Sequence, residues 1–580
     1  MGISRSNLKV TLENRGLLTL RPNDHIATGG EGSIYRAGDT ALKIYLKPEK
    51  AIWNDVAGKV VFFNANQNPY IVGPKGKVYN EMNEIIGYYM DFISTGESIA
   101  RVFTNEYWRD KGFEYKDVFT LVARMREIIQ FAHNHNALLI DANELGYFVI
   151  PGQHHDPEPR IIDVDSWVLN NKFPPQVAIM PSIRDWHTNG WNSGSDWFAW
   201  GIVTFQVFTG IHPYKGGLNG YKPNEMERRM KNNASVFTPD IRLNHAVRDL
   251  FKIPGLLYDW YVATFQDGNR SVPPSPFDTG VAKTQITKIL YATTTATGTL
   301  VFERLFSKID DTAIKVFSCG VALLESGSLV DLATKKEIYQ VRSRDCEVIK
   351  TQQGWLIATF EGQELSCVFV NENNLERTSL LLTLRGSRFL RYENRLFLVT
   401  DQGATEIMVN FLSKPILTIG QTWGVMVNST RWFDGLGIQD ALGAMFLVVP
   451  FGEYACAQIR VKELDGLTPI TAKAGNRFAT VIALDKQGGY QKLELAFAAN
   501  YQTYKLWQGG TDGPNLNVAI LPKLVCATIV NDGELTVYIP QTGVINKVAD
   551  KQITTKMFLF NWNNLVVYIV NGSVWSIHMR

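Results

Sequence analysis

The chain has 580 residues, which is too long for one ordinary hydrophobic core, so the sequence predicts two or more domains. Hydrophobic residues make up 45% of the chain and charged residues 20%, a balance typical of folded rather than disordered protein. The 58 basic and 56 acidic side chains leave a net charge of +2, which provides no general attraction to nucleic acid or to an anionic membrane. The sequence contains neither a signal-peptide pattern nor the roughly 18 apolar residues of a spanning helix, so we expect a soluble, cytoplasmic protein.

A glycine cluster between two β-like runs is the first candidate site. It reads Thr28-Gly29-Gly30-Glu31-Gly32, and without Cβ atoms its backbone N–H groups could approach phosphate oxygens closely. A tight hairpin without a ligand uses the same residues, so that alternative stays open for this segment alone. Lys43 follows in the apolar run 41–45. A fixed positive charge beneath a turn of this size favours nucleotide binding.

Two long helices and two polar loops follow. Apolar residues recur at three- and four-residue spacings over 118–135, and a second helix is predicted over about 195–209. The segment 137–143 after the first helix ends in Asp141-Ala142-Asn143, and the segment 161–167 contains Asp163-Val164-Asp165. The proline-rich stretch near residue 273 ends the helical pattern and predicts a domain boundary.

Strands replace helices after about residue 300. Short apolar runs alternate with Gly, Asn and Asp turns, and pairs of strands begin about every 40 residues, which suits the four-stranded blades of a seven-bladed β-propeller. A pair of β-sandwiches remains the alternative. The predicted pairs begin near Gly320, Trp355, Arg395, Ala444, Ala479, Leu524 and Phe558.

Cysteines and tryptophans of this second half are expected to pack rather than react. No Cys-x-x-Cys pair or His/Cys cluster indicates zinc, so the five cysteines are predicted to be buried thiols. Single tryptophans in β-rich domains usually pack in the core, although a binding face is the alternative. The residues concerned are Cys319, Cys346, Cys367, Cys456, Cys526, Trp423, Trp432 and Trp507.

The first half resembles the protein kinases. Residues 29–35 and 41–45 are similar to the glycine-rich loop and the β3 lysine, and residues 87–92 to the last N-lobe strand and hinge. The segment 137–143 then matches the catalytic loop, and Asp165-Ser166-Trp167 stands where kinases have Asp-Phe-Gly. The most specific match is 195–214, which resembles the helix whose aspartate, here Asp196, anchors the catalytic loop. The chain looks closest to atypical bacterial and phage kinases.

This resemblance implies an α+β bilobal kinase-like fold followed by an all-β domain. The N-lobe would span 1–92, the C-lobe 93–280, a linker 281–300 and the all-β domain 301–580. The cofactors implied are ATP and Mg²⁺. Gly29, Gly30, Gly32 and Lys43 would hold the phosphates, and the backbone at Met90 and Asp91 the adenine. Asp141, Lys43 and Asn143 would be catalytic, and Asp165, Asp163 and Asn143 would bind the metal. Arg270 would pair with the activation segment.

Several positions depart from the kinase pattern. Gly146 stands where kinases have a metal-binding asparagine, so one metal ligand is missing. The acidic partner of Lys43 would be Glu49 or Asp55, although neither spacing fits well. The segment Met180-Pro181-Ser182 lacks the acidic residue of Ala-Pro-Glu. His133 and His135 precede the loop, and solvated histidines at a helix end are the simpler interpretation.

These departures leave three hypotheses open. The first is an active Ser/Thr kinase whose β-propeller recruits a protein substrate. The second is a pseudokinase that acts as a protein-interaction scaffold, since loss of a metal ligand removes transition-state stabilisation without preventing nucleotide binding. A structural component of a phage particle is the third, and it would place the protein in a virion or the host cytoplasm. The sequence indicates neither a nucleic acid partner nor a membrane segment.

Overall fold

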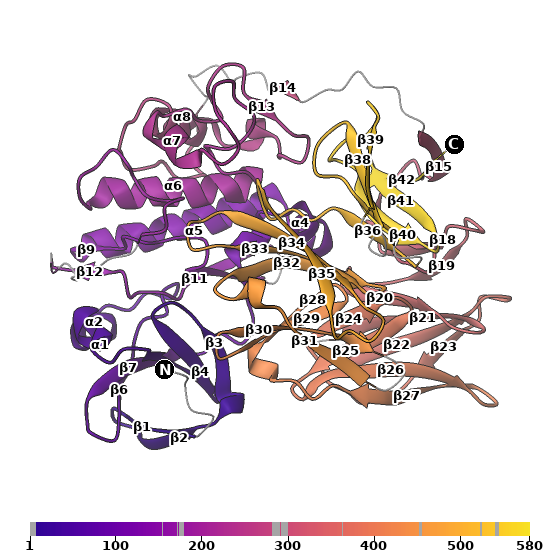
Figure 1. The fold of residues 1–580 in the computed structure, drawn as a ribbon, viewed down its shortest axis with the longest axis horizontal. Helices are drawn as coiled ribbons and strands as arrows, with labels where there is room; N and C mark the ends of the chain where they lie inside the picture. Colours follow the sequence, from indigo (N-terminus) through magenta and orange to yellow (C-terminus); the bar gives the residue numbers. More distant parts are fainter. Residues whose placement is uncertain are drawn as a thin grey trace.

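The computed structural model describes residues 7–152, 155–170, 172, 179–280, 290–291, 300–361, 364–451, 455–522, 525–539 and 544–579. Figure 1 shows three parts, which we call the sheet lobe (7–92), the helical lobe (93–280) and the seven-sheet domain (300–579). The two lobes lie one above the other, and the seven-sheet domain lies beside both of them.

The sheet lobe contains one seven-stranded sheet and two short helices. Its strand order is β2-β1-β6-β7-β5-β4-β3, and all neighbours whose pairing is described run antiparallel. The predicted lysine strand is β5, which lies between β4 and β7 in the middle of the sheet. The elements are β1 (Leu8–Leu12), β2 (Gly16–Leu20), β3 (His25–Thr28), β4 (Gly32–Ala37), β5 (Thr40–Tyr45), α1 (Lys50–Trp53), α2 (Val56–Ala65), β6 (Gly76–Tyr79) and β7 (Ile85–Asp91).

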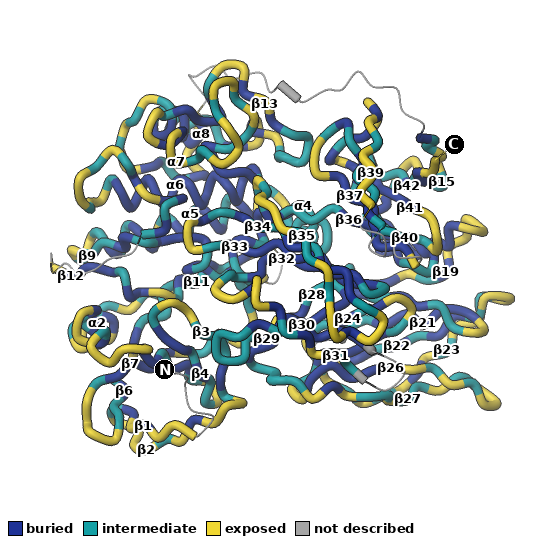
Figure 2. Tube along the Cα trace, in the orientation of Figure 1, coloured by how far each residue is buried: buried dark blue, intermediate teal, exposed yellow. Residues whose placement is uncertain are grey.

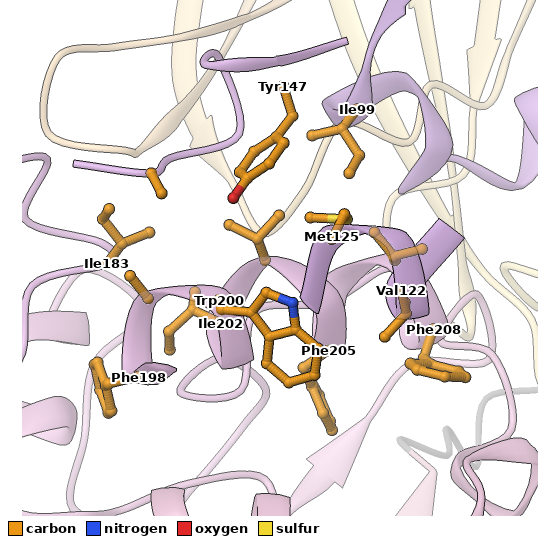
Figure 3. Close-up of a cluster of buried hydrophobic side chains, with 14 of the residues drawn as sticks. Ile99, Val122, Met125, Tyr147, Ile183, Phe198, Trp200, Ile202, Phe205 and Phe208 are labelled. Carbon is orange, nitrogen blue, oxygen red and sulfur yellow. The ribbon is translucent and has the colours of Figure 1, made fainter. Parts of the chain in front are cut away.

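Two long helices form the centre of the helical lobe. Helix α5 (Tyr115–Asn134) begins three residues before its predicted start because Glu114 and Asp117 form a capping box there. Helix α6 (Ser193–Thr209) is buried along nearly its whole length, as expected for a helix that is apolar on all sides. Both helices confirm the sequence prediction to within three residues (Figures 2 and 3).

Shorter elements complete this lobe. Side chains from several of them, including Ile99, Tyr147 and Ile183, pack with Met125 of α5 and Trp200 of α6 in the core that Figure 3 shows. These elements are β8 (Glu97–Ser98), α3 (Ile99–Val102), α4 (Asn105–Lys111), β9 (Ala137–Leu138), β10 (Tyr147–Ile150), β11 (Glu158–Ile161), β12 (Val168–Leu169), α7 (Met226–Lys231), β13 (Arg242–Leu243) and α8 (Gly255–Phe265).

The last part of the chain forms seven separate four-stranded antiparallel sheets. In the last sheet β15, which comes first along this domain, pairs with the C-terminal strand β42, so the two ends of the domain are joined by backbone hydrogen bonds. The sheets run from β16 (Ala313–Val316) to β19 (Glu337–Gln340), β20 (Cys346–Lys350) to β23 (Arg377–Leu380), β24 (Arg388–Tyr392) to β27 (Pro415–Thr422), β28 (Thr430–Phe433) to β31 (Ala455–Arg460), β32 (Thr468–Gly475) to β35 (Tyr504–Thr511), β36 (Val518–Leu521) to β39 (Val544–Ala549), and β40 (Phe558–Trp562), β41 (Leu565–Val570) and β42 (Ser573–Met579) with β15 (Leu300–Phe306).

The strand periodicity in the sequence located these sheets well. Each of the seven predicted strand pairs falls in a different sheet, and Leu524 itself lies just outside the described residues, before β37 (Val525–Thr528). Seven sheets of four strands exclude the alternative of two β-sandwiches. Within the expected linker 281–300, Leu290–Tyr291 forms β14, which pairs in parallel with β13 of the helical lobe, and Leu300 begins β15. Residues 281–289 and 292–299 lie outside the description.

The tryptophans and cysteines of the seven-sheet domain behave as packing residues. Trp423 and Trp432 are buried, and their rings lie 6.1 Å apart. Trp507 is half-buried with its ring edge on Tyr538. All five cysteines are free thiols, and burial raises the pKa of Cys346 to about 12. The prediction of buried, unpaired thiols is therefore confirmed for the residues that are fully buried, Cys346, Cys367 and Cys526, whereas Cys319 and Cys456 are half-buried.

One hydrophobic core joins the helical lobe to the seven-sheet domain. Ile470, Ile482, Leu484 and Tyr490 come from the sheet β32–β35, yet they are buried in the same cluster as α5 and α6. Burial of shared apolar surface stabilises the contact between domains, so the seven-sheet domain is fixed against the helical lobe by core packing.

Substitution of Gly87 tests the position of the lysine strand. A Cβ atom on Gly87 of β7 would lie 1.9 Å from the carbonyl oxygen of Lys43 on β5, so β5 would have to shift. We expect Gly87→Ala to lower the free energy of unfolding by about 1–3 kcal/mol, the usual cost of overpacking. Chemical denaturation measures it. Gly424→Ala is the matched control, because no atom lies within 4 Å of its added Cβ, and equal stabilities of the two variants would contradict the packing described.

Candidate functional site

One cavity of about 1160 Å³ brings the predicted site residues together. It lies between the sheet lobe and the helical lobe and extends to the seven-sheet domain, and we call it the shared cavity. Gly146, the position of the missing metal ligand, also lies on its wall. The predicted residues on the wall are Gly29, Gly30, Gly32, Lys43, Met90, Asp91, Asp141, Asn143, Asp163 and Asp165.

The glycine cluster forms the turn between β3 and β4, which we call the glycine turn (28–32). The Gly29 N–H donates to the Gly32 carbonyl at 2.9 Å and closes the turn. A Cβ on Gly32 would lie 2.7 Å from the Ile44 carbonyl, so this glycine is required by packing against β5. Around Gly30 there is open space, which leaves room for a ligand against the backbone of the turn.

Lys43 crosses from the sheet lobe to two carboxylates of the helical lobe. Its Nζ lies 2.6 Å from Asp165 Oδ2 and 3.2 Å from Asp163 Oδ1. Burial favours the neutral amine, but the two carboxylates outweigh it and raise the pKa of Lys43 well above its usual value. The lysine is therefore a permanent cation beside the glycine turn.

Asp165 is held by more groups than its counterpart Asp163. The hydroxyls of Tyr45 and Tyr88 both donate to Asp165 Oδ1, at 3.0 and 3.1 Å. Burial opposes its ionisation, but Lys43 and Lys59 overcome that effect and lower the pKa of Asp165. Asp163 differs because 54% of its side chain is exposed. Of the two carboxylates assigned to the metal, Asp163 is the more accessible, although its Oδ1 contacts Lys43 and accepts from the Asp165 N–H at 3.2 Å.

The predicted acidic partner of Lys43 is wrong. Glu49 is exposed at the start of α1, and Asp55 accepts from the Gly58 N–H and caps α2. The residue of α2 that faces the site is instead Lys59, whose Nζ donates to the Asp165 carbonyl at 2.6 Å. Burial lowers the pKa of Lys59 to about 8. Its position among Val56, Val60 and Phe63 was the signal in the sequence that this lysine is buried.

Asp196 fixes the loop that carries Asp141. Its carboxylate accepts from the Leu139 and Ile140 N–H groups at 2.9 Å each, as the kinase resemblance implied. Ile140 has a φ of 68°, which a β-branched residue rarely adopts, and the two hydrogen bonds hold this strained conformation. The helix cap is Asn192, so Asp196 is not an N-cap.

His133 supports the same carboxylate. Its Nε2 lies 3.0 Å from Asp196 Oδ2, and only 12% of its side chain is exposed. The simpler interpretation of a solvated helix-end histidine is therefore wrong for His133, because α5 ends directly beside α6. His135 instead contacts the carbonyl of Phe131 through Nδ1 at 2.8 Å.

Asp141 lies in the cavity wall with two hydrogen bonds to its carboxylate. The Met180 N–H donates to Oδ1 at 2.9 Å and Asn143 Nδ2 donates to Oδ2 at 3.0 Å. Burial raises the pKa of Asp141 to about 6, so the carboxylate is ionised at neutral pH and can accept a proton there. Asn143 Oδ1 accepts from the Leu145 N–H at 2.8 Å. Asn143 thus ties down the loop.

The ligands implied for a metal ion, Asp163, Asp165 and Asn143, all lie on the wall of the shared cavity. Among the residues that the structure describes, no three His, Cys, Asp or Glu side chains are grouped as metal ligands. Gly146 offers only backbone there, and the nearest atom to a Cβ on it would be the Asn143 carbonyl at 3.4 Å. A cation would therefore rely on Asp163 with water or ligand oxygens, the coordination that Mg²⁺ commonly has.

The side chains of the residues expected to form the hinge, Met90 and Asp91, are not the groups that we expect to contact a base. Asp91 lies at the end of β7 and its carboxylate pairs with Lys75 at 2.6 Å, on the exposed surface. The Phe92 N–H is already bonded to the Asp39 carbonyl. Met90 to Ile93 nevertheless line the shared cavity.

The segment after Met180 contains an acidic residue, Asp185, that was not predicted from the sequence to have a role. Asp185 forms a two-point ion pair with Arg270, at 2.6 and 2.8 Å. Arg270 was expected to pair with the activation segment, and the partner that the structure shows lies just beyond Met180-Pro181-Ser182. The signal was present four residues beyond Pro181.

Comparison with known proteins provides little beyond this geometry. No protein-family model matches the chain, and no curated protein matches it either. Among solved structures, the autoinhibited serine kinase domain of the giant muscle protein titin is similar at a TM-score of 0.33 and 14% identity, over 46% of this chain and 77% of that one. A likeness this low carries no argument about function. Within the described residues, no helix has the length and apolarity to cross a membrane.

Removal of the Asp196 carboxylate tests the anchoring of the loop. We expect Asp196→Ala to lower the free energy of unfolding by at least about 2 kcal/mol, because each buried N–H left without an acceptor costs on the order of 1–3 kcal/mol. Chemical denaturation measures the change. The control Asp267→Ala removes an exposed carboxylate of the same lobe and should change stability little. A loss no larger than in this control would show that Asp196 does not hold the loop.

The raised pKa of Asp141 predicts a pH dependence of stability. A carboxyl whose pKa rises from 3.8 to about 6 on folding binds its proton more tightly when folded, so its contribution to stability falls as pH rises between these values. Asp141→Asn cannot titrate. We expect the variant to gain stability relative to the wild type over this interval and to keep a constant difference above it. Denaturation at stepped pH checks this, and a difference independent of pH would refute the assignment.

Proposed function

We propose that this chain is a protein-kinase-like phosphotransferase that binds ATP with Mg²⁺. In this proposal the sheet and helical lobes are the two lobes of the kinase fold, and the seven sheets are the blades of a β-propeller. The acceptor is a Ser or Thr hydroxyl of a protein recruited through the seven-sheet domain.

The observation that carries the proposal is the convergence of separate segments on one cavity. Asp141 and Asp163 lie far along the sequence from the glycine turn and Lys43, yet all of these residues line the same space. They comprise a backbone turn, a fixed cation, a proton acceptor and an accessible carboxylate. Positioning and electrostatic stabilisation are the main contributions that a protein makes to phosphoryl transfer, and these groups provide both.

The residues present fit a nucleotide and one metal ion. Open space at Gly30 and the ammonium of Lys43 suit phosphate oxygens, while Asp163 suits Mg²⁺. ATP would supply the transferable phosphoryl group, and Mg²⁺ would neutralise part of its charge. Asp141 is placed to accept the proton of the acceptor hydroxyl, since its pKa of about 6 leaves it ionised at neutral pH.

A catalytically impaired scaffold is the second candidate. It is favoured by the engagement of Asp165, whose Oδ1 accepts from two tyrosines while Oδ2 pairs with Lys43. Because Gly146 adds no metal ligand, the site holds fewer metal-binding groups than the kinase pattern implies. In this alternative the nucleotide stabilises the fold and the seven-sheet domain provides the working surface.

A binding assay and a transfer assay separate the two candidates. We expect millimolar ATP with Mg²⁺ to raise the melting temperature, since a ligand that binds only the folded state stabilises it. We also expect transfer of labelled phosphate, and its loss in Asp141→Ala and Asp165→Ala but not in Asp267→Ala. A thermal shift without transfer would establish the scaffold, and labelled phosphate that persists in both site variants would refute the catalytic roles.

A further inference from the structure

The shared cavity extends from the cleft to the first strands of all seven sheets. Residues of each of these strands lie on its wall, so the cleft opens onto the place where the seven strands converge. One representative from each strand, from β16 to β40, is Lys315, Glu347, Arg388, Arg431, Pro469, Val518 and Phe560. Side chains of the seven-sheet domain can therefore take part in binding within the cleft.

The seven-sheet domain also holds the glycine turn directly. The Thr28 N–H donates to Asp440 Oδ2 at 2.9 Å, and Asp440 lies on β29 (Leu436–Ala441). The second oxygen, Asp440 Oδ1, accepts from the Gly443 N–H at 2.6 Å. Nearby, the Asn428 amide donates to the Asn23 carbonyl at 3.0 Å. Figure 1 shows β3 beside β29 accordingly, and the position of the turn depends on this domain.

Where the seven-sheet domain meets the glycine turn, the Arg431 guanidinium has N–H donors that no hydrogen bond among the described residues uses. It lies on β28 between the buried Thr430 and Trp432 and is exposed, on the wall of the shared cavity. Among the described residues its one hydrogen bond goes from Nη1 to the Pro469 carbonyl at 3.5 Å, although a guanidinium carries five N–H donors. The surrounding protein lowers the pKa of Arg431, and the charge of Asp440 only partly offsets this effect.

Most other cations of the cavity wall have acidic partners, and Lys486 is the exception among the described residues. Lys315 Nζ lies 2.7 Å from Glu347 Oε1, and Arg388 Nη2 lies 3.7 Å from Glu97 Oε1. The nearest acid to act on Arg431 is Asp440, and both oxygens of that carboxylate already accept from backbone N–H groups. Arg431 is thus a cation with unused hydrogen-bonding capacity, next to the residue that holds the glycine turn.

We propose that Arg431 binds a phosphate-class anion in the shared cavity, between the seven-sheet domain and the glycine turn. The planar fork of a guanidinium matches two oxygens of such an anion, and spare donors inside a protein-walled cavity strengthen the interaction. Two sources share this chemistry: the terminal phosphate of the nucleotide and a phosphate on the acceptor. The identification of the source rests on the proposed function, whereas anion binding by Arg431 can be tested without it.

Calorimetric titration with tripolyphosphate tests the site without a nucleoside. We expect Arg431→Ala to weaken tripolyphosphate binding by about tenfold or more, as loss of a charged hydrogen bond implies, and Arg431→Lys to weaken it less. Lys486→Ala is the control, because Lys486 is another exposed cation on the cavity wall. Melting temperatures without ligand verify that each variant is folded. Equal affinities of wild type and Arg431→Ala, or no binding by the wild type, would overturn the proposal.

Titrations with ATP and ADP, each with Mg²⁺, identify the source of the anion. If Arg431→Ala weakens ATP but not ADP, the ligand is the terminal phosphate of the nucleotide. If ATP and ADP bind Arg431→Ala as tightly as they bind the wild type, and tripolyphosphate competes with neither nucleotide, the ligand is a separate phosphate that the acceptor carries. A wild type that binds tripolyphosphate but not ATP would refute the proposed function and leave the anion site standing.

Discussion

The carboxylate of Asp165 joins the two lobes, and the geometry of the site depends on it. It comes from the helical lobe, but its partners Lys43, Tyr45 and Tyr88 all belong to the sheet lobe. A buried ion pair stabilises a fold only when further hydrogen bonds satisfy both charges. Here the two tyrosines donate to Asp165, and Lys43 donates to Asp163 as well. Removal of one partner from such a pair typically costs about 3–5 kcal/mol, because it leaves a buried charge uncompensated. The groups around Asp165 thus link the two lobes directly at the shared cavity.

The seven-sheet domain adds a second constraint because it contacts both lobes. It holds the glycine turn of the sheet lobe through Asp440, and it shares a hydrophobic core with the helical lobe. A contact between His245 Nδ1 and Asp532 Oδ2, at 2.6 Å, adds to the packing of the seven-sheet domain against the helical lobe. Tight packing is visible where a Cβ on Gly488 would lie 1.9 Å from Ser182 Oγ, in the segment just after Pro181. Opening of the cleft would therefore require the seven-sheet domain to shift against at least one lobe.

Residues whose role depends on local pattern were predictable from the sequence. The period of apolar residues located α5 and α6, and the spacing of strand pairs located all seven sheets. The string that contains Asp196 predicted an anchored loop, because the resemblance there covers a helix and the turn after it. The glycine turn and Lys43 were found in the same way, through residues that lie close together in the chain.

Contacts between distant segments were not predictable. Lys59 contacts Asp165, which lies more than a hundred residues away in the sequence, and nothing near Lys59 in the sequence predicts this contact. The pairing of Thr28 with Asp440 depends on how the two domains dock, which no local pattern encodes. The expectation that Glu49 or Asp55 pairs with Lys43 was wrong for the same reason. The kinase pattern was applied to a segment in which this chain buries Lys59. Asp163 and Asp165 could be listed from the sequence, but only burial separates the exposed carboxylate from the engaged one.

The central claim is that the shared cavity is a nucleotide site beside Lys43. An experimental structure with a non-hydrolysable ATP analogue and Mg²⁺ tests it most directly. We predict phosphate oxygens beneath the glycine turn beside the Lys43 ammonium, the base along the backbone beyond Asp91, and the metal ion at Asp163. A cavity without nucleotide at saturating ligand, with the contacts of Lys43 to Asp163 and Asp165 unchanged, would contradict the account.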